Sequence, residues 1–580
     1  MTVAVRESIV LRSDVPLGAY PERVGDDLVR WAARAPERVF LAERRESGWR
    51  SLTYAQALAH ARRAGAGLLA RGGAGGAPLA ILAENGLDHA IAALAALYAG
   101  VPFSSISTGY GRADADPARL RAILDTLEPR AIFVPDAAAA ARIAATCPHL
   151  ERIADHTELD GDEATADAAF ARIGGDTVAK IVFTSGSTGA PKGVITTHRM
   201  LCANQAMLEL AWGEYIADPV MVDWMPWSHV ASGNKIFGMI LHHGGTMYVD
   251  EGRPLGDQFA ATLRNLREIA PTVYVTVPRG HALLAEVLRG DTALAATFFS
   301  RLRLLFNAGA SLAPSVRLAL SRLAREHGGR DVPILSPYGA TETAPMATAV
   351  WGTHPPDAVT IGTPVPGVEA KLAPLGDRFE IRLRGPNVTP GYWRNAAATA
   401  AAFDEEGYYR TGDAGELADP ADPARGIVFR GRLAENFKLS TSTWVNVGAL
   451  RIALLEAAGG LFEDVVLAGE DRDDVRALVF VEPRAAGALA GRGGGDRAEL
   501  ARSAAVREAA TFALRAHNAA NPGSSTRIGR LLLLPDGPRL GDGELTDKGT
   551  VNQRRALAVR AADVERLYAD SADADVLVLP

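Results

Sequence analysis

The sequence is poor in cysteine and has no long hydrophobic run. Its 580 residues include only Cys147 and Cys202, which excludes a disulfide framework and a zinc site built from cysteines. The apolar stretch 90–101 is too short to cross a bilayer, which takes about 20 residues. Residues 1–15 carry early charges, so no secretory signal is expected. We therefore expect a protein of the reducing cytoplasm that does not enter a membrane.

The sequence also lacks an excess of positive charge. It has 61 Lys and Arg against 68 Asp and Glu, a net charge of −7, which gives no argument for nucleic acid or a membrane surface as a partner. A hydrophobic content of 48% with 22% charged residues is typical of folded globular proteins. At about 150 residues per domain the length allows roughly four structural units. We expect small-molecule partners and a monomer or homodimer.

Apolar patterns of strand and helix alternate along most of the chain. Strands are predicted at 78–83, 131–134, 246–249, 273–277, 302–306 and 332–335, and helices at 87–99, 118–127, 138–144, 258–269 and 315–327. This alternation predicts an α/β fold in which parallel sheets are buried between helical layers. Residues 362–417, rich in Gly, Pro and short β-like runs, predict a smaller β-rich subdomain.

A domain boundary is expected near residues 431–435. Beyond it we predict strands at 465–467, 477–481 and 531–534, a long helix at 497–517 and a mobile surface loop at 485–495. This terminal piece of about 145 residues has the size of a separate domain. We therefore predict an N-terminal domain of residues 1–432 and a small α+β C-terminal domain of residues 433–580.

The most informative stretch runs from Phe183 to Val194 and reads Phe-Thr-Ser-Gly-Ser-Thr-Gly-Ala-Pro-Lys-Gly-Val. A buried strand is predicted before it at 178–183 and a helix after it at 196–207. Glycines let backbone N–H groups approach an anion, and hydroxyls and an ammonium add further donors. The common nucleotide P-loop places Ser or Thr after its lysine, whereas Gly193 follows Lys192. A flexible surface linker is the alternative, but the flanking strand and helix favour a polyphosphate-binding loop.

This loop resembles the phosphate-binding loop of adenylate-forming enzymes, the superfamily of acyl-CoA synthetases, luciferases and peptide-synthetase adenylation domains. The resemblance implies a catalytic role for Lys192. It also implies contacts to ATP or AMP from Thr184, Ser185, Gly186, Ser187, Thr188, Gly189 and Lys192.

Further motifs follow in the order of that superfamily. In Tyr338-Gly339-Ala340-Thr341-Glu342 the resemblance assigns Tyr338 and Gly339 to the adenine, Thr341 to the α-phosphate and Glu342 to Mg²⁺, a hard ion that prefers oxygen ligands. In residues 408–413 it assigns Asp413 to the ribose hydroxyls, and it places Arg432 at the ribose or phosphate. Read singly, these residues would be a turn with a solvated glutamate, a turn aspartate and a surface arginine.

The stretch 224–229, Trp-Met-Pro-Trp-Ser-His, resembles the motif that borders the acyl site. The resemblance implies an acid pocket lined by Trp227, His229, Gly309 and Ala340, with His229 as a catalytic residue that gates the pocket or meets the phosphate. An isolated histidine is more often a satisfied core residue.

Residues 431–445 resemble feruloyl-CoA synthetases most closely and share a looser pattern with long-chain acyl-CoA synthetases. This implies a coenzyme A region at Lys438 and Trp444. It also implies a mobile C-terminal domain that turns about a hinge near Ala434, where Asp or Lys is usual. Ser442 stands where a glycine is often found.

Superfamily members carry a catalytic lysine late in the chain. Aligned on Thr546 and Gly549, the usual lysine position falls on Thr550, and Lys548 lies two residues earlier. We expect Lys548 to serve this role; the alternative is a solvated turn lysine.

The resemblance implies an ATP-dependent carboxylic acid–CoA ligase that uses Mg²⁺ and passes through an acyl-AMP intermediate. We expect a hydroxycinnamic acid such as ferulate as substrate. Because no carrier-domain motif is found, we expect free coenzyme A as acceptor, ahead of a separate carrier protein. A fatty acyl-CoA ligase is one alternative. A nucleotide-binding pseudoenzyme is another, motivated by Ala434 and the displaced Lys548.

Overall fold

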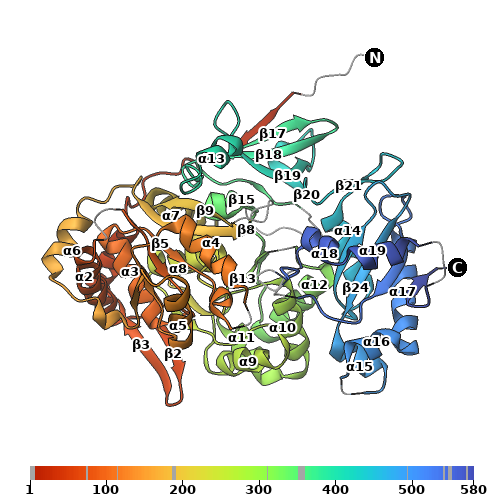
Figure 1. The fold of residues 1–580 in the computed structure, drawn as a ribbon, viewed down its shortest axis with the longest axis horizontal. Helices are drawn as coiled ribbons and strands as arrows, with labels where there is room; N and C mark the ends of the chain where they lie inside the picture. The colour runs from red at the N-terminus through yellow and green to blue at the C-terminus, as the bar shows by residue number, and fades with distance from the viewer. Residues whose placement is uncertain are drawn as a thin grey trace. The chain divides into compact units, whose positions relative to one another are not determined.

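The computed structural model describes residues 7–72, 76–113, 115–185, 191–309, 311–350, 360–492, 494–539, 542–545, 551–569 and 573–579. They fall into two compact units (Figure 1). The larger unit draws on residues 1–374, 381–411 and 417–428, and the smaller on residues 375–380, 412–416 and 429–580. A functional division at 432/433 stays a prediction.

The first sheet of the larger unit has the strand order β7-β6-β4-β5-β8-β9. Its strands are β4 (Leu79–Ile81), β5 (Phe103–Ser105), β6 (Ala131–Phe133), β7 (Glu151–Ile153), β8 (Val178–Ser185) and β9 (Pro191–Thr197). All neighbours are parallel except β9, which runs antiparallel to β8. The prediction of parallel sheets is therefore confirmed, with strand ends shifted by a few residues.

Helices α2 (Tyr54–Ala70), α3 (Leu87–Ala99), α4 (Pro117–Leu127) and α5 (Ala137–Thr146) belong to the same part of the chain. The side chain of Thr53 accepts a hydrogen bond from the Gln56 N–H and caps α2. Helix α2 packs against α3 (Figure 1). Helix α3 has the predicted bounds because Gly100, at φ 69°, adopts a left-handed conformation that glycine takes without strain.

Two more sheets belong to the larger unit, and their neighbouring strands are parallel except for β2 and β3, which are antiparallel. One has the order β10-β11-β2-β3 and the other β12-β13-β14. The strands are β2 (Val39–Arg45), β3 (Gly48–Thr53), β10 (Val220–Asp223), β11 (Thr246–Val249), β12 (Val273–Thr276), β13 (Leu304–Asn307) and β14 (Ile334–Leu335), and the helices around them include α7 (His198–Ile216), α8 (Phe237–His243), α9 (Phe259–Glu268), α10 (Pro278–Gly290), α11 (Thr292–Ser300) and α12 (Pro314–Gly328).

The predicted β-rich subdomain is confirmed as a five-stranded sheet of order β1-β17-β18-β19-β20. Its strands are β1 (Ile9–Arg12), β17 (Glu369–Leu375), β18 (Arg378–Arg384), β19 (Tyr409–Leu417) and β20 (Ile427–Arg432). Strand β1, from the start of the chain, pairs antiparallel with β17.

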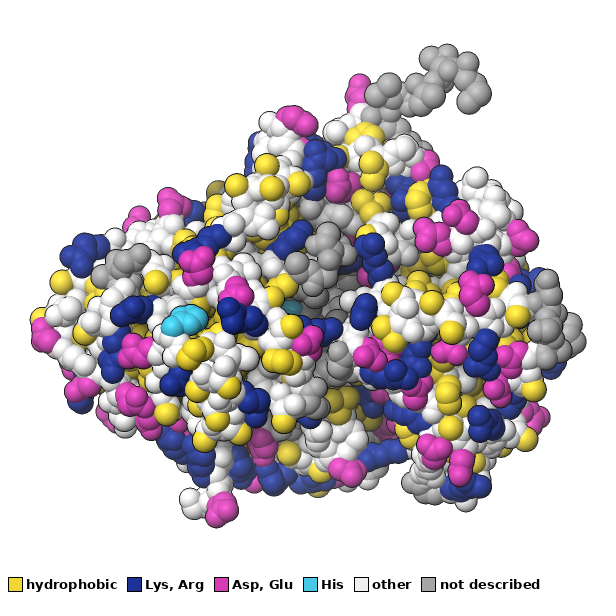
Figure 2. Space-filling model, in the orientation of Figure 1, with side chains coloured by type: hydrophobic (Ala, Val, Ile, Leu, Met, Phe, Trp, Pro, Cys, Tyr) yellow, Lys and Arg dark blue, Asp and Glu magenta, His cyan; other side chains and the backbone are white. Residues whose placement is uncertain are grey.

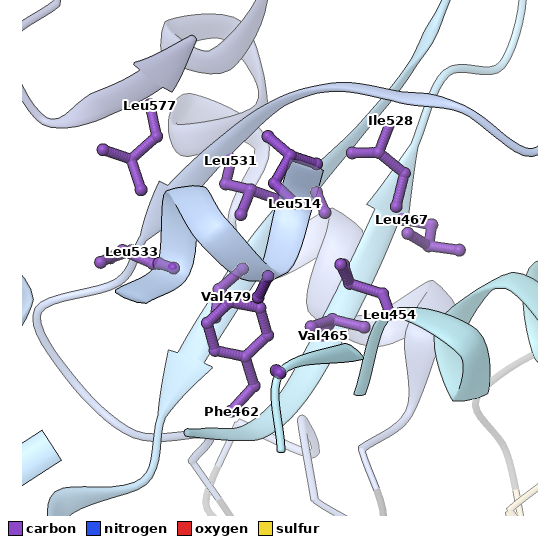
Figure 3. Packing of buried hydrophobic residues seen from close by; sticks show 14 of the residues in the cluster. Leu454, Phe462, Val465, Leu467, Val479, Leu514, Ile528, Leu531, Leu533 and Leu577 are labelled. Atoms are coloured by element: carbon purple, nitrogen blue, oxygen red, sulfur yellow. The ribbon is translucent and has the colours of Figure 1, made fainter. Parts of the chain in front are cut away.

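The smaller unit is built on a four-stranded mixed sheet of order β23-β24-β25-β26, and both faces of this sheet are covered. The elements are α14 (Val447–Ala457), β23 (Phe462–Ala468), β24 (Val475–Val481), α17 (Ala504–Ala520), β25 (Ile528–Leu533), α18 (Gln553–Val559), α19 (Ala561–Tyr568) and β26 (Val576–Val578). Alternate residues such as Val465, Leu467 and Val479 pack with Leu454 and Leu514 of α14 and α17 (Figure 3). Residues in between, such as Leu478 and Phe480, pack with α18 and α19.

Three local predictions were wrong. The loop after β8 does not lead directly into a helix: Pro191–Thr197 first pairs with β8 as strand β9, because this β-branched stretch completes a hairpin, and α7 begins at His198. The long helix at 497–517 is two helices, α16 (Arg497–Arg502) and α17, separated by the extended backbone of Ser503. The loop at 485–495 begins within α15 (Pro483–Leu489), which Glu482 caps.

Charges of both signs are distributed over the surface. On the face drawn in Figure 2, the Lys and Arg side chains of the described residues are interspersed with Asp and Glu. No helix within the described ranges is long and apolar enough to span a bilayer. Cys147 and Cys202 are buried free thiols.

Candidate active site

Strands β8 and β9 hold the two ends of the predicted phosphate loop together. Thr184, near the end of β8, is the cross-strand partner of Lys192 on β9, and Ser185 lies opposite Pro191. The hairpin therefore fixes the backbone on both sides of the loop. Of the predicted nucleotide ligands, Gly186, Ser187, Thr188 and Gly189 lie outside the described residues, as does the side chain of Ser185.

Lys192 and Glu342, predicted to serve phosphate and Mg²⁺, both lie next to one tyrosine, Tyr392. The Tyr392 hydroxyl donates a hydrogen bond of 2.9 Å to Oε1 of the buried Glu342. The Lys192 ammonium lies 5.5 Å from the centroid of the same ring. Burial, followed by the Glu342 charge, raises the pKa of Tyr392, so its hydroxyl stays a donor. Tyr409 is buried beside them, and burial and the Glu342 charge raise its pKa too. The cluster thus combines a cation with an oriented carboxylate.

The segment that carries Glu342 is held by backbone contacts. Tyr338 pairs with Thr348, and a Cβ at Gly339 would lie 1.7 Å from the Pro345 carbonyl oxygen, so only glycine fits there. The Ala340 N–H donates to Thr343 Oγ1 at 2.8 Å. Thr341 and Glu342 lie in the short 3₁₀ turn Thr341–Thr343. This packing fixes the position at which the carboxylate is presented.

In the smaller unit, the two predicted ribose residues are neighbours. Arg432 Nε, at the end of β20, lies 3.5 Å from Asp413 Oδ1 on β19. Asp413 is buried and Arg432 is exposed. The pair offers a fixed carboxylate beside a solvent-accessible guanidinium, which is the combination that the nucleotide prediction requires.

The predicted coenzyme A residues are also neighbours. Lys438 on β21 (Phe437–Lys438) is the cross-strand partner of Trp444 on β22 (Trp444–Val445), and its ammonium lies 4.8 Å from the Trp444 ring centroid. The Arg378 guanidinium lies 3.4 Å from the same centroid, and Trp444 Nε1 donates to Asp377 Oδ1 at 3.2 Å. Two cations on one indole are chemically suited to a phosphate-bearing ligand.

The two departures from the superfamily pattern have clear local structures. Ser442 keeps the left-handed conformation that favours glycine, with φ 63°. Ala434 lies in an exposed turn closed by hydrogen bonds from the N–H groups of Glu435 and Asn436 to the Arg432 carbonyl. Lys548, with Thr546 and Thr550, lies outside the described residues.

A cavity of about 40 Å³ lies against Trp227, one of the four predicted acid-pocket residues. The other three lie outside its lining among the described residues. His229 is half-buried and its Nδ1 accepts from the Ala231 N–H at 3.2 Å. Gly309 is exposed just after β13, and Ala340 is half-buried in the turn before Glu342. Their role at the acid remains a prediction.

The cavity contains a buried lysine that sequence reasoning missed. Lys180 on β8 is 5% exposed, and its ammonium donates 2.9 Å hydrogen bonds to the Gly233 carbonyl and to Asn234 Oδ1. Burial lowers the pKa of Lys180 to about 7. The available signal was a charge inside the apolar run from Val178 to Phe183. Tyr392 was missed too, and no local pattern links it to Glu342, 50 positions away.

Comparisons with known proteins identify what the chain is similar to. A family model described as "AMP-binding enzyme" matches residues 28–393. The long-chain-fatty-acid–CoA ligase 2 of Schizosaccharomyces pombe is 30% identical over 298 residues, 42% of either chain. The indoleacetate–CoA ligase of Aromatoleum aromaticum is 30% identical over 269 residues, 44% of this chain and 48% of that ligase. The chain thus matches less than half of the length of either relative.

Two solved structures cover nearly the whole chain. The adenylation domain of a carboxylate reductase from Mycobacterium chelonae aligns with a TM-score of 0.73 at 22% identity, over 97% of this chain and 94% of that domain. ATP-bound MatB from Rhodopseudomonas palustris aligns with a TM-score of 0.68 at 23% identity, over 93% of this chain and 99% of MatB. The α/β fold with a large N-terminal and a small C-terminal domain is therefore shared with them.

Proposed function

The chain belongs to the AMP-binding enzyme family of adenylate-forming proteins, and on that premise we propose that it is an AMP-forming ligase that joins a carboxylic acid to coenzyme A. The observation that carries the proposal is the cluster of Lys192, Tyr392 and Glu342 beside the phosphate loop. A cation for phosphate and an oriented carboxylate are what adenylation requires at one place. Acid-dependent exchange of pyrophosphate into ATP separates such a ligase from a nucleotide-binding pseudoenzyme, which would bind ATP without exchange.

In the first half-reaction, a carboxylate oxygen of the acid bonds to the α-phosphorus of ATP. The bond from that phosphorus to the bridging oxygen breaks, and pyrophosphate leaves with the electron pair. Lys192 offsets negative charge on the phosphates, and Tyr392 holds Glu342 in one orientation. Glu342 fits Mg²⁺, which proteins bind through one or two carboxylates together with substrate phosphates. Bound Mg²⁺ would neutralise phosphoryl charge.

In the second half-reaction, the sulfur of coenzyme A attacks the acyl carbonyl and AMP leaves. We assign Asp413 and Arg432 to the ribose, and Lys438 with Trp444 to coenzyme A. The two half-reactions need different groups at one carbonyl, so we expect the small domain to turn about the exposed segment at Ala434 between them. Lys548 is assigned to the first half-reaction only.

A hydroxycinnamic acid such as ferulate is the proposed substrate. Support comes from the similarity of residues 431–445 to feruloyl-CoA synthetases and from the aromatic wall at Trp227. A rigid aromatic ring buries a large apolar area in a matching slot. The S. pombe relative is named for long-chain fatty acids and supports the alternative, whereas the A. aromaticum relative is named for an aryl acid.

The test measures AMP release with ATP, Mg²⁺ and coenzyme A against a panel of acids. We expect kcat/KM for ferulate, p-coumarate and caffeate to exceed that for dodecanoate. A higher kcat/KM for dodecanoate would assign the protein to fatty acids instead.

A further inference from the structure

We propose that the cavity behind Trp227 is a subsite for the oxygen substituent at the far end of an aromatic carboxylic acid, with Lys180 as its principal hydrogen-bond donor. This inference rests on the ligase function proposed above and adds the feature of the acid that the site selects.

The walls of the cavity are mainly apolar, with a few polar groups among them. Apolar side chains from α3, β5, α7 and α8 line most of it: Ala93, Leu97, Phe103, Leu201, Phe237 and Leu241. Its polar lining residues are Asp27, His89, Ser105, Lys180, Gln205 and Asn234, together with the indole of Trp227. Of these, His89 pairs with Ser105 at 2.9 Å and Asp27 pairs with His242 at 2.8 Å. Apolar walls with a few placed polar groups are typical of small-molecule sites.

Several of these polar groups are buried without a partner. Trp227 Nε1, Asn234 Nδ2 and Gln205 Oε1 have no hydrogen bond within the described part of the chain, although each residue is less than 5% exposed. Lys180 has two acceptors for its three N–H groups. A buried polar group left unsatisfied costs about 1–3 kcal/mol, so an oxygen-bearing guest would relieve these costs.

The hydrogen-bonding groups of the cavity define which substituent of the acid can bind there. Trp227, Asn234 and Lys180 offer donors, and Gln205 offers one acceptor. A phenol hydroxyl can accept from the donors and donate to Gln205, and a neighbouring alkoxy oxygen can accept only. The end of an alkyl chain can do neither, so it would leave the unpaired atoms of Trp227, Asn234 and Gln205 without a partner.

Strand β8 connects this subsite to the phosphate loop. Side chains alternate along a strand, so Lys180, Val182 and Thr184 lie on one face. Ile181 and Phe183 confirm the alternation, because they pack into the core on the opposite face. At a rise of about 3.3 Å per residue, Lys180 lies roughly 13 Å along the strand from Thr184. A rigid acid directed from the loop toward Lys180 would carry its ring oxygen to the Lys180 ammonium.

The test compares two acids that differ by one hydroxyl, 4-hydroxycinnamate and cinnamate, in acid-dependent exchange of pyrophosphate into ATP. The measured quantity is the ratio of their kcat/KM values. A site that hydrogen-bonds a substrate hydroxyl rejects the analogue without it, so the parental ratio should favour 4-hydroxycinnamate. In Lys180→Met we expect the ratio to fall by about 10-fold or more.

Lys235→Met is the matched control. Lys235 is also a buried lysine and lies in the same π-helical turn, Ala231–Ile236, as Asn234. Its ammonium lies over the Phe306 ring at 4.3 Å, and Lys235 does not line the cavity among the described residues. The ratio should keep its parental value in this variant.

A second variant, Trp227→Phe, keeps an aromatic ring and removes the unpartnered N–H. We expect the ratio to fall by roughly 3- to 10-fold. Should Lys180→Met not fold, Trp227→Phe tests the subsite by itself. An unchanged ratio in each folded variant, with exchange intact, overturns the subsite. If no acid supports exchange in the parental protein, the ligase proposal itself fails, which is a separate outcome.

Discussion

The hydroxyl of Tyr392 donates a 2.9 Å hydrogen bond to Oε1 of Glu342. These residues come from separate segments, and the Lys192 ammonium beside the Tyr392 ring brings in a third. One tyrosine thus contacts both the predicted metal ligand and the predicted phosphate cation. Each part of this arrangement can be removed separately.

Glu342→Gln keeps the shape of the side chain and removes its charge. We expect adenylation to fall by about 10²-fold or more and its dependence on Mg²⁺ to weaken, since an electrostatic stabiliser of the transferring phosphoryl group is lost. AMP release measured over a Mg²⁺ titration checks this. Turnover and Mg²⁺ dependence equal to those of the parental protein would exclude Glu342 from the site.

Tyr392→Phe removes the hydrogen bond and keeps the ring. A hydrogen bond to a charged group contributes about 1.5–3 kcal/mol, so we expect kcat/KM for ATP to fall by roughly 10-fold as Glu342 loses its orientation. Tyr408→Phe is the matched control, because the Tyr408 hydroxyl donates a 2.6 Å hydrogen bond to another carboxylate, Glu369 Oε2. Equal losses in both variants would mean that Tyr392 only stabilises the fold.

Lys548→Ala separates the two half-reactions. Lys548 should neutralise charge while the acid attacks ATP and should not be needed once acyl-AMP exists. We expect formation of acyl-AMP to slow by about 10²-fold or more. Thioester formation from presynthesised acyl-AMP and coenzyme A should stay near the parental rate. If neither half-reaction changes, Lys548 is a turn residue, and if both fail equally it supports the small domain.

Lys180 should make stability depend on pH. Burial lowers its pKa to about 7 from 10.5. Between these values the unfolded chain binds a proton that the folded chain does not, so the free energy of unfolding rises with pH across this window and is lowest below about pH 7. The change in melting temperature that Lys180→Met causes should therefore be more positive at about pH 6 than at about pH 9.5.

Lys371→Met is the control for the melting temperatures of Lys180→Met at the two pH values. Lys371 is buried too, but its ammonium pairs with Asp404 at 2.6 Å and Glu406 at 2.8 Å. Burial alone would lower its pKa, and the two carboxylates outweigh burial and raise it. This substitution should lower the melting temperature at both pH values. A change in melting temperature in Lys180→Met that does not vary with pH would contradict the assignment of a lowered pKa.

The sequence predicts elements whose ends are marked by a local constraint. Helix α3 was predicted to the residue because Gly100 supplies the left-handed position that ends it. Strand β9 was missed because its pairing with β8 is a contact across the loop that the residues 191–197 do not reveal by themselves.

The same limit applies to the candidate site. The order of the motifs predicts a phosphate-binding role for Lys192 and a Mg²⁺-binding role for Glu342. Their common contact with Tyr392 could not be predicted, because it depends on how distant segments pack. Lys180 differs, because a charge within a buried strand is visible in the sequence and indicates that the strand faces polar partners.

The exchange of labelled pyrophosphate into ATP, with and without ferulate, tests the central claim most directly. Reversible acyl-AMP formation predicts exchange that requires both ferulate and Mg²⁺ and that is lost in Glu342→Gln. No exchange with ferulate or any other acid of the panel, or exchange that proceeds equally without acid, would contradict the assignment of this protein as an acid-activating ligase.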